Sequence, residues 1–532
     1  MFKQQSRMKN EGVNMKSRIL SLVVFLVFVL MITAGCGTAA NNSSDGKDAA
    51  ANGSGKSAKD TLKIAYSDSP DSLDCNLTSI NMSEKMCANI YGTLLKFDGD
   101  YKPQPYIAKS WEISPDGLTY TFKLRDDVKF HDGKKLTAKD VVYSLKKSQE
   151  SAFNGAFLAP VKEFKQVDDY TVSLVLVAPY APLLNVLCEP LIGIFNEETY
   201  NAAGDSFKTK PISCGPYKVA EWLPENKIVL ERFDDFFEGP APIKTIEVRL
   251  IPDETTKGIS IENGEVDAAE NISTTDRQNI MNNKKLNFFE TPSTKYFHMA
   301  INNENGKLGD VKVRQALSYA VNKKAVIDTA MDGIGQEAVC TVNDKCFGFP
   351  ANFTEYEYNT EKAKQLLAEA GKTGLKIEII IKYSELNKKM AETIQADLNK
   401  GGFDCSIKIS EAGGFSDAIE KGNYDLCLLT WSDSLMDADA IVAYRFDSKF
   451  MGFAGNWSRI KDAKLEKLVV DARSTNDVEK RKEYYKQMFE YVRDQAFEKP
   501  LFYSMNNLAA NKDLKIKKAL PTGIYYYNDW SW

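Results

Sequence analysis

Residues 375–433 read LKIEIIIKYSELNKKMAETIQADLNKGGFDCSIKISEAGGFSDAIEKGNYDLCLLTWSD, and this stretch decides the fold class. The apolar residues predict three short strands separated by two helices, with strands over 375–383, 403–410 and 424–431 and helices over 387–400 and 415–421. Strands that alternate with helices at this spacing form a parallel sheet buried on both faces. The sequence therefore predicts an α/β fold.

Polar residues follow the last of these strands. Ligands of open α/β sheets bind outside the carboxyl ends of the strands. Trp431, Ser432 and Asp433 stand at such an end, and the segment 66–68 follows an earlier predicted strand. We expect Trp431, Ser432 and Asp433 to contact a ligand, with burial in the core as the alternative for Trp431.

The composition is that of a globular protein with several domains. The 532 residues are 43% apolar, 11% aromatic and 27% charged, which rules out wholesale disorder. The net charge of −5, from 68 basic and 73 acidic residues, argues against a nucleic acid as the main partner. Histidine occurs only at His131 and His298, which weighs against a zinc hydrolase, and we expect neither a metal nor a cofactor.

Two helices are predicted outside the stretch 375–433. Thr137 starts one of them, since a threonine followed by an acid three residues later, here Asp140, is a helix-capping pattern. The other spans Val311 to Met331 as one long helix with an apolar face.

The N-terminal residues have the pattern of an export signal. A basic segment precedes an apolar run from Ile19 to Ile32, and the small-residue motif TAGC ends at Cys36. The run is shorter than the ~20 residues of a spanning helix, so we interpret 1–35 as a secretory signal peptide. The motif resembles a bacterial lipobox with Cys36 as the lipidated residue. We assign 36–60 to this cysteine and a flexible polar linker.

Eight further cysteines leave two alternatives open. None of them forms a Cys-x-x-Cys pair, which argues against zinc-ribbon and thioredoxin sites. An exported protein forms disulfides in an oxidising compartment, and Cys340 and Cys346 are close enough in sequence to staple a loop. In an organism that lives without oxygen, all eight would stay thiols and act as small buried apolar residues.

Several motifs then resemble one known family, the extracellular solute-binding proteins of family 5, which serve oligopeptide and dipeptide ABC importers. The run AKSWEISPDGLTYTF at 108–122 continues into LRDDVKFHDG at 124–133 and LTAKDV at 136–141. Further matches follow in the family's order: CGPY at 214–217, NGEVD at 263–267, VRQALSYA at 313–320 and AKQLLAEAG at 363–371.

The resemblance implies a fold of two α/β lobes, the type II periplasmic-binding-protein-like fold with an extra inserted subdomain. It assigns the segments as follows: lobe one to 61–92, 211–290 and 503–532, the inserted subdomain to 93–210, and lobe two to 291–502. The ligand cleft lies between the lobes, which close over the ligand. An extended peptide would pair there with exposed strand edges.

The family's ligand contacts map onto this chain residue by residue. Trp431 matches the tryptophan that precedes the family's ligand-facing segment. In peptide binders of the family an aspartate three residues later often holds the peptide's amino group, and here that place is Ser434. Because serine carries no negative charge, this departure argues against an amine clamp formed by residue 434. The resemblance also implies ligand contacts for four further residues: Ser213, Cys214, Tyr296 and Tyr503.

The resemblance implies a binding protein and not an enzyme. We expect a monomeric receptor, lipid-anchored on the extracytoplasmic face of the cell membrane, that binds a short peptide and delivers it to the permease of an ABC importer. The alternatives are a nickel chelate, a sugar or a signalling peptide as the ligand, or an exported hydrolase. The hydrolase lacks support from motifs, since neither Gly-x-Ser-x-Gly nor His-Glu-x-x-His occurs.

Overall fold

The computed structural model describes residues 59–432, 434–452, 454–517 and 521–532. The expected signal peptide, the lipidated Cys36 and the linker up to residue 58 lie outside the described residues, and so does Asp433. None of the helices in the described ranges is long and apolar enough to cross a membrane.

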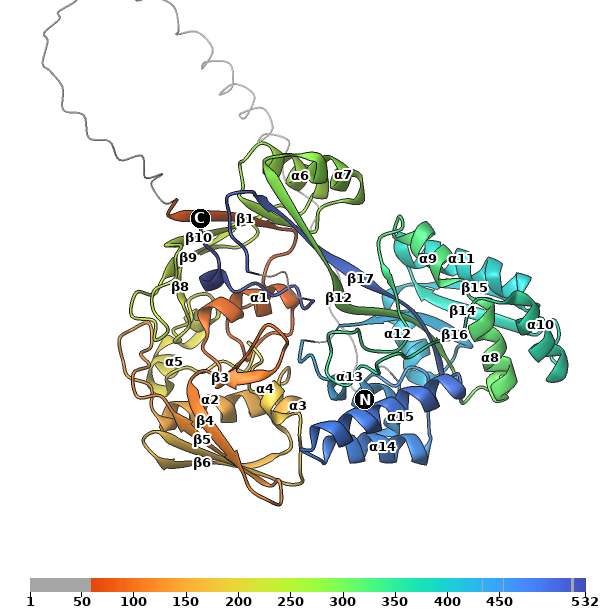
Figure 1. The fold of residues 1–532 in the computed structure, drawn as a ribbon, viewed down its shortest axis with the longest axis horizontal. Coiled ribbons are helices and arrows are strands. Elements are labelled where there is room, and N and C mark those ends of the chain that lie inside the picture. The colour runs from red at the N-terminus through yellow and green to blue at the C-terminus, as the bar shows by residue number, and fades with distance from the viewer. Residues whose placement is uncertain (1–58, 433, 453, 518–520) are drawn as a thin grey trace, which may run out of the picture. The chain divides into compact units, whose positions relative to one another are not determined.

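One mixed sheet runs through the described part of the chain (Figure 1). Its eleven strands lie in this order: β15 (Asp404–Ser410), β14 (Lys376–Lys382), β16 (Leu426–Trp431), β12 (Leu286–Ile301), β17 (Glu498–Asn511), β11 (Ala268–Glu270), β1 (Thr61–Tyr66), β10 (Thr245–Leu250), β9 (Lys227–Arg232) and β8 (Tyr217–Leu223), with β13 (Gln336–Glu337) beside β17. The long strands β12 and β17 pair antiparallel and carry the sheet from one lobe into the other.

The stretch that decided the fold class forms the sheet of lobe two. β14 pairs parallel with both β15 and β16, as predicted, and α11 (Glu385–Lys400) and α12 (Ala412–Lys421) connect them. The expected burial on both faces fails for β15, which is the edge strand: Cys405 is buried, whereas Ile409 is 49% exposed. An edge strand has one neighbour, so the helices that cover the central strands leave part of it in solvent.

A second, antiparallel sheet belongs to the inserted part of the chain. Its order is β4 (Ala108–Ile113), β5 (Thr119–Leu124), β7 (Thr171–Leu176) and β6 (Val161–Asp168), and a two-stranded hairpin of β2 (Leu95–Phe97) and β3 (Pro103–Pro105) lies beside it. Helix α2 (Ala138–Glu150) starts where the capping pattern predicts, because the Thr137 amide donates to the Asp140 carboxylate at 2.8 Å.

The buried apolar side chains form separate cores. One lies around β1, β8 to β10 and α1 (Asn81–Ile90), and a second lies under the four-stranded sheet. A third packs β14 and β16 against α8 (Val311–Ala320), α10 (Thr360–Glu369) and α11. A fourth joins α13 (Asp439–Phe446), α14 (Ala463–Arg473) and α15 (Val478–Asp494). Separate cores are what a two-lobed fold with an inserted subdomain requires.

The remaining helices are short. They are α3 (Gly155–Leu158), α4 (Leu183–Val186), α5 (Glu197–Ala203), α6 (Glu254–Glu262), α7 (Thr274–Asn282) and α9 (Lys323–Ala330), with 3₁₀ turns η1 (Gly204–Lys208), η2 (Gly306–Leu308), η3 (Ser448–Phe450) and η4 (Tyr527–Asp529).

The long helix expected over 311–331 is wrong, because the chain breaks it into α8 and α9. Val321 and Asn322 leave the helical conformation, and the Asn322 side chain accepts the amide of Ala325 at 3.1 Å. An asparagine that caps a new helix competes with continuation of the previous one.

The eight cysteines within the described residues are free, so the loop staple between Cys340 and Cys346 is not formed. All eight are buried, as the thiol alternative requires.

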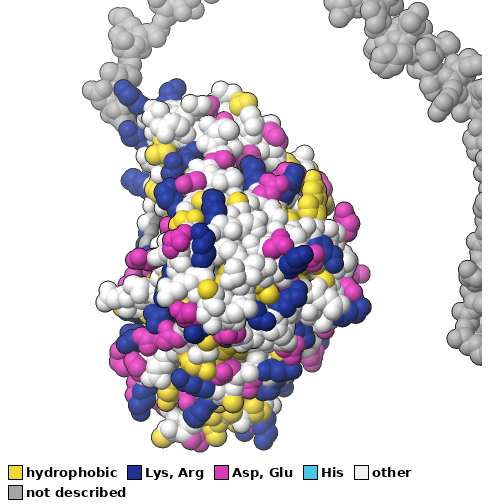
Figure 2. All heavy atoms as spheres, turned by 90° about the vertical axis from the view of Figure 1, so that its right-hand side faces the viewer, with side chains coloured by type: hydrophobic (Ala, Val, Ile, Leu, Met, Phe, Trp, Pro, Cys, Tyr) yellow, Lys and Arg dark blue, Asp and Glu magenta, His cyan; other side chains and the backbone are white. Residues whose placement is uncertain are grey.

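The surface of lobe two carries charges of both signs. On the face that Figure 2 presents, Lys and Arg side chains alternate with Asp and Glu side chains, and apolar side chains are scattered among them.

Candidate functional site

A cavity of about 920 Å³ lies between the lobes. Its wall combines the loop after β1, helix α1, the inserted subdomain, the middle of β12 and β17, and the segments of lobe two after α9 and β16. Cavities of this size accommodate small-molecule and short-peptide ligands. Because each lobe contributes to the wall, a ligand here would touch all parts of the fold at once.

The charged residues of this wall are mostly acidic. Six carboxyl groups face two lysines: Asp68, Glu84, Glu189, Glu254, Glu270 and Asp332 against Lys85 and Lys295. With one proton shared between Glu84 and Glu189, the excess is three negative charges. The buried Lys85 is already paired with Glu270, at 2.5 Å between Nζ and Oε2. Burial lowers the pKa of Lys295, which opposes its positive charge. The cavity therefore favours a cation over an anion.

Glu189 is the most deeply buried acid of this wall, with 1% of its surface exposed. The Ser434 hydroxyl donates to its Oε2 atom at 2.8 Å. Its carboxyl also hydrogen-bonds to that of Glu84 on α1, which requires a proton on one of the two. Burial raises the pKa of Glu189, and the hydrogen bonds with Glu84 and Ser434 lower it in part.

This acid pair brings three segments together. Glu84 comes from α1 of lobe one, Glu189 follows α4 of the inserted subdomain, and Ser434 follows β16 of lobe two. The hydrogen bond from Ser434 therefore joins lobe two to the inserted subdomain across the cavity.

The middle of β12 is irregular where it borders the cavity. Pro292 of β12 pairs with Met505, and the next paired residue is Tyr296 with Tyr503. Three residues of β12, numbers 293–295, thus oppose the single Ser504, and all four line the cavity. The bulge leaves backbone groups outside the ladder, and these have other partners within the protein. The Thr294 amide donates to the Pro521 carbonyl at 3.0 Å, and the Lys295 amide donates to the Ser293 hydroxyl at 3.0 Å.

The segment after β16 is placed at the cavity, as the strand-end argument predicts. Ser432 lines it. The Trp431 side chain is half-buried and packs against Tyr444 and Trp457, with ring centroids 5.7 and 5.5 Å away. Trp431 is not among the residues of the cavity wall.

Ser213 and Cys214 are buried and do not line the cavity. The buried Ser213 hydroxyl donates to the carbonyl of Ile194 at 2.6 Å. The Cys214 thiol packs so closely on Gly92 that a Cβ there would lie 2.8 Å from the sulfur atom. His131 holds the same segment, because its Nε2 lies 3.0 Å from the Gly215 carbonyl, and burial lowers its pKa to about 4.

Tyr296 and Tyr503 are also buried inside the protein in this conformation. The Tyr503 hydroxyl lies 2.7 Å from the Cys340 carbonyl and donates into it. The Tyr296 hydroxyl donates to Glu498, which is ion-paired with Arg445. Neither tyrosine lines the cavity. Contact between these side chains and a ligand stays a prediction.

Sequence reasoning missed the acid pair. Glu84 and Glu189 lie far apart in the chain, and only the fold brings them into contact. One signal was present: Glu84 and Lys85 are adjacent charges within an apolar helix, and buried charges need partners.

Comparisons with known proteins agree with this architecture. Residues 102–453 match the profile of the bacterial extracellular solute-binding proteins, family 5 (middle part). The chain is 30% identical to the dipeptide-binding protein of Escherichia coli (strain K12), over 88% of this chain and 94% of that protein. Among solved structures, HbpA2 from Haemophilus parasuis superposes with a TM-score of 0.82 at 27% identity, covering 88% of this chain and 99% of that one. The periplasmic binding protein DppA from Helicobacter pylori, in complex with the peptide STSA, gives a TM-score of 0.75 at 25% identity, covering 89% and 98%.

Proposed function

Because the chain belongs to family 5 of the bacterial extracellular solute-binding proteins, we propose that it captures a short peptide between its lobes and delivers it to the permease of an ABC importer. Members of this family are extracytoplasmic solute-binding proteins and not enzymes. The observation that carries the proposal is the cavity of about 920 Å³, whose wall is shared by both lobes and the inserted subdomain.

The wall has the chemistry that a peptide backbone needs. Peptides present alternating amide donors and carbonyl acceptors, and neutral amide and hydroxyl side chains match both. The cavity wall includes several of these: Asn81, Asn271, Asn506, Ser67, Ser293, Ser432 and Ser504.

We propose that the acid pair holds the amino terminus of the peptide. Ser434 stands where peptide binders of the family often have an aspartate, and here Glu189 supplies a carboxylate to the same place from across the cavity. An ammonium group that replaces the shared proton would leave Glu84 and Glu189 both ionised around one positive charge. The acidic excess of the cavity supports such a ligand.

The predicted site residues divide into two groups in this proposal. Ser432 contacts the ligand, and Asp433 follows it in the same segment. Trp431 supports this segment from behind through its packing on Tyr444 and Trp457.

The remaining parts of the proposal concern the domain boundaries, export and membrane anchoring. Residues 61–92, 211–290 and 503–532 form lobe one, 93–210 the inserted subdomain and 291–502 lobe two. The signal peptide 1–35 directs export, and Cys36 carries the lipid that anchors a monomer to the outer face of the cell membrane. The anchor keeps the receptor near its permease, and the linker up to residue 60 gives it reach.

Native mass spectrometry of the full chain with Cys36→Ser, after gentle purification, tests the proposal. Adducts that sequence as short peptides would support it and give the length preference. A single non-peptide adduct, such as a nickel chelate or a sugar, would support the assignment as a solute receptor and contradict the assignment of a peptide as its ligand. Turnover of a peptide mixture would instead indicate an exported hydrolase. A protein without adducts would next be titrated with tetra-alanine by calorimetry, and the absence of heat would count against a peptide ligand.

A further inference from the structure

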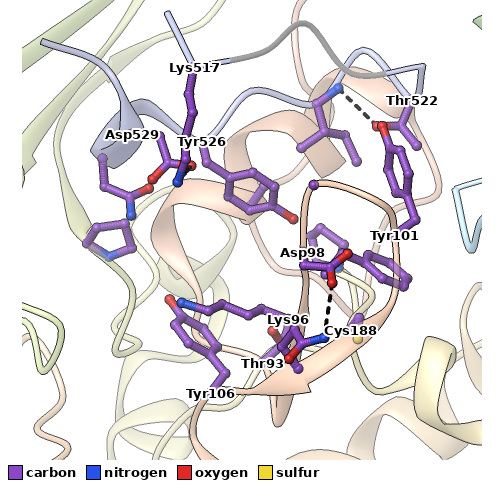
Figure 3. A pocket seen from close by; sticks show the side chains of 18 of the residues that line it. Thr93, Lys96, Asp98, Tyr101, Tyr106, Cys188, Lys517, Thr522, Tyr526 and Asp529 are labelled. Atoms are coloured by element: carbon purple, nitrogen blue, oxygen red, sulfur yellow. Dashed lines mark hydrogen bonds and ion pairs between the residues drawn. The ribbon is translucent and has the colours of Figure 1, made fainter.

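A second cavity, of about 440 Å³, lies beside the main one (Figure 3). It is lined by the end of helix α1, the β2–β3 hairpin and the C-terminal segment 521–530. Ser434 and Thr522 line both cavities, so the two adjoin at these residues. We call this space the side chamber.

Aromatic rings dominate the wall of the side chamber. Figure 3 shows Tyr526 in the middle of the chamber, with Tyr101 on one side and Tyr106 on another. Phe97 lies edge-on to Tyr101, at 6.0 Å between ring centroids. Burial raises the pKa of Tyr101 and of Tyr526, so both phenols stay neutral at physiological pH. Rings arranged in this way pack well on another flat ring.

Two of the three carboxylates of the chamber wall are paired with its two lysines, and the third accepts backbone amides. Lys96 is hydrogen-bonded to Glu238, and the Lys517 ammonium lies 3.5 Å from Asp529. Asp98 accepts the backbone amides of Asp100 and Lys102, at 2.8 and 3.0 Å. An ion would have to break one of these interactions, whereas an uncharged group would not.

The amide oxygen of Asn528, a residue of this wall, still needs a partner. The Oδ1 atom of Asn528 is buried and has no hydrogen-bond partner among the described residues. An oxygen of this kind accepts a hydrogen bond from a phenol or an indole N–H, and a buried acceptor without a donor is costly.

From these observations we infer that the side chamber binds an aromatic group of the solute, with tyrosine and tryptophan side chains as the best-matched class. The inference rests on the proposed function, because the group enters from the main cavity past Ser434 and Thr522. Full burial of such a ring is expected to tighten binding roughly 10- to 100-fold.

The test uses the full chain with Cys36→Ser and five probes, tetra-alanine and the four peptides that carry one tryptophan in place of an alanine. We expect calorimetry to show that tryptophan at one position binds at least about tenfold more tightly than tetra-alanine. Tyr526→Ala should remove most of this preference, and Tyr526→Phe should keep it, because the ring remains. Tyr383→Ala, which changes an exposed tyrosine of lobe two, serves as the matched control. Thermal denaturation establishes that each variant is folded.

The outcomes separate the inference from the proposed function. Equal affinity for all five peptides would contradict the inference that the side chamber binds an aromatic group. The proposed function as a peptide receptor would be unaffected. If no peptide binds, the peptide assignment fails, and the chamber is tested alone with 5-fluoroindole by fluorine NMR. Binding of the indole that Tyr526→Ala weakens would then support the chamber, and the absence of binding would overturn it.

Discussion

Replacing Glu189 by glutamine should weaken binding of peptides that have a free amino terminus. Glutamine keeps the size of the side chain, and its carbonyl oxygen still accepts the hydrogen bond that Ser434 donates at 2.8 Å. What the variant loses is the carboxylate that would face an ammonium group in a site with 1% exposure. Hydrogen bonds to charged groups contribute about 1.5–3 kcal/mol. The dissociation constant should therefore rise roughly 10- to 100-fold.

Calorimetry with two ligands isolates this effect. Tetra-alanine should lose affinity in Glu189→Gln, whereas N-acetyl-tetra-alanine, which has no ammonium group, should not. Glu254→Gln provides the matched control, because it removes the same charge from an exposed position of the cavity wall. A change of about twofold or less is expected there, since solvent screens an exposed charge. Equal losses for the free and the acetylated peptide would refute the ammonium site.

The pH dependence of binding follows from the same pair. Burial raises the pKa of Glu189, and the ammonium must displace the proton that Glu189 shares with Glu84. Affinity for tetra-alanine should therefore fall as the pH falls through this raised pKa, and Glu189→Gln should lose that dependence. The stability of the empty protein should change with pH in the opposite direction to the affinity. A carboxyl with a raised folded-state pKa binds its proton more tightly when folded, so the free energy of unfolding should decrease as the pH rises from the unfolded value through the raised one.

Three further predictions concern stability and the cysteines. Trp431→Ala should lower the free energy of unfolding by about 2 kcal/mol, because its half-buried ring packs on Tyr444 and Trp457; an unchanged thermal midpoint would show that this packing contributes little. Asn322→Ala should cost about 1 kcal/mol through loss of the cap of α9, measured by urea denaturation, and a neutral result would mean that α9 needs no cap. The unreduced, denatured Cys36→Ser chain should react with eight equivalents of a thiol reagent, and six or fewer would reveal a disulfide.

Local patterns were enough to predict the sheet of lobe two. The apolar runs of 375–431 form β14, β15 and β16 with the expected parallel pairing, because hydrophobic periodicity reports burial directly. The helix expected over 311–331 failed because one polar side chain, Asn322, decides where a helix restarts. Such capping depends on a single residue, whereas periodicity averages over many.

The candidate site was only partly predictable. Ser432 follows from the rule that ligands bind at strand ends, since the rule needs only the order of elements. Glu84 and Glu189 do not follow, because their neighbours in sequence are ordinary and their contact depends on how α1 meets the inserted subdomain. Ser213 and Cys214 match the family pattern, yet in the fold they are buried and do not line the cavity.

The bulge of β12 also has a mechanical consequence. The lobes are joined by two strands that are hydrogen-bonded to each other, so relative motion is restricted to bending and twisting of one ribbon. The ladder of this ribbon is interrupted where residues 293–295 oppose only Ser504, and these residues line the cavity. A solute bound there would contact this ribbon and restrict its bending between the lobes. A permease that grips both lobes would then sense loading as stiffness, without touching the solute itself.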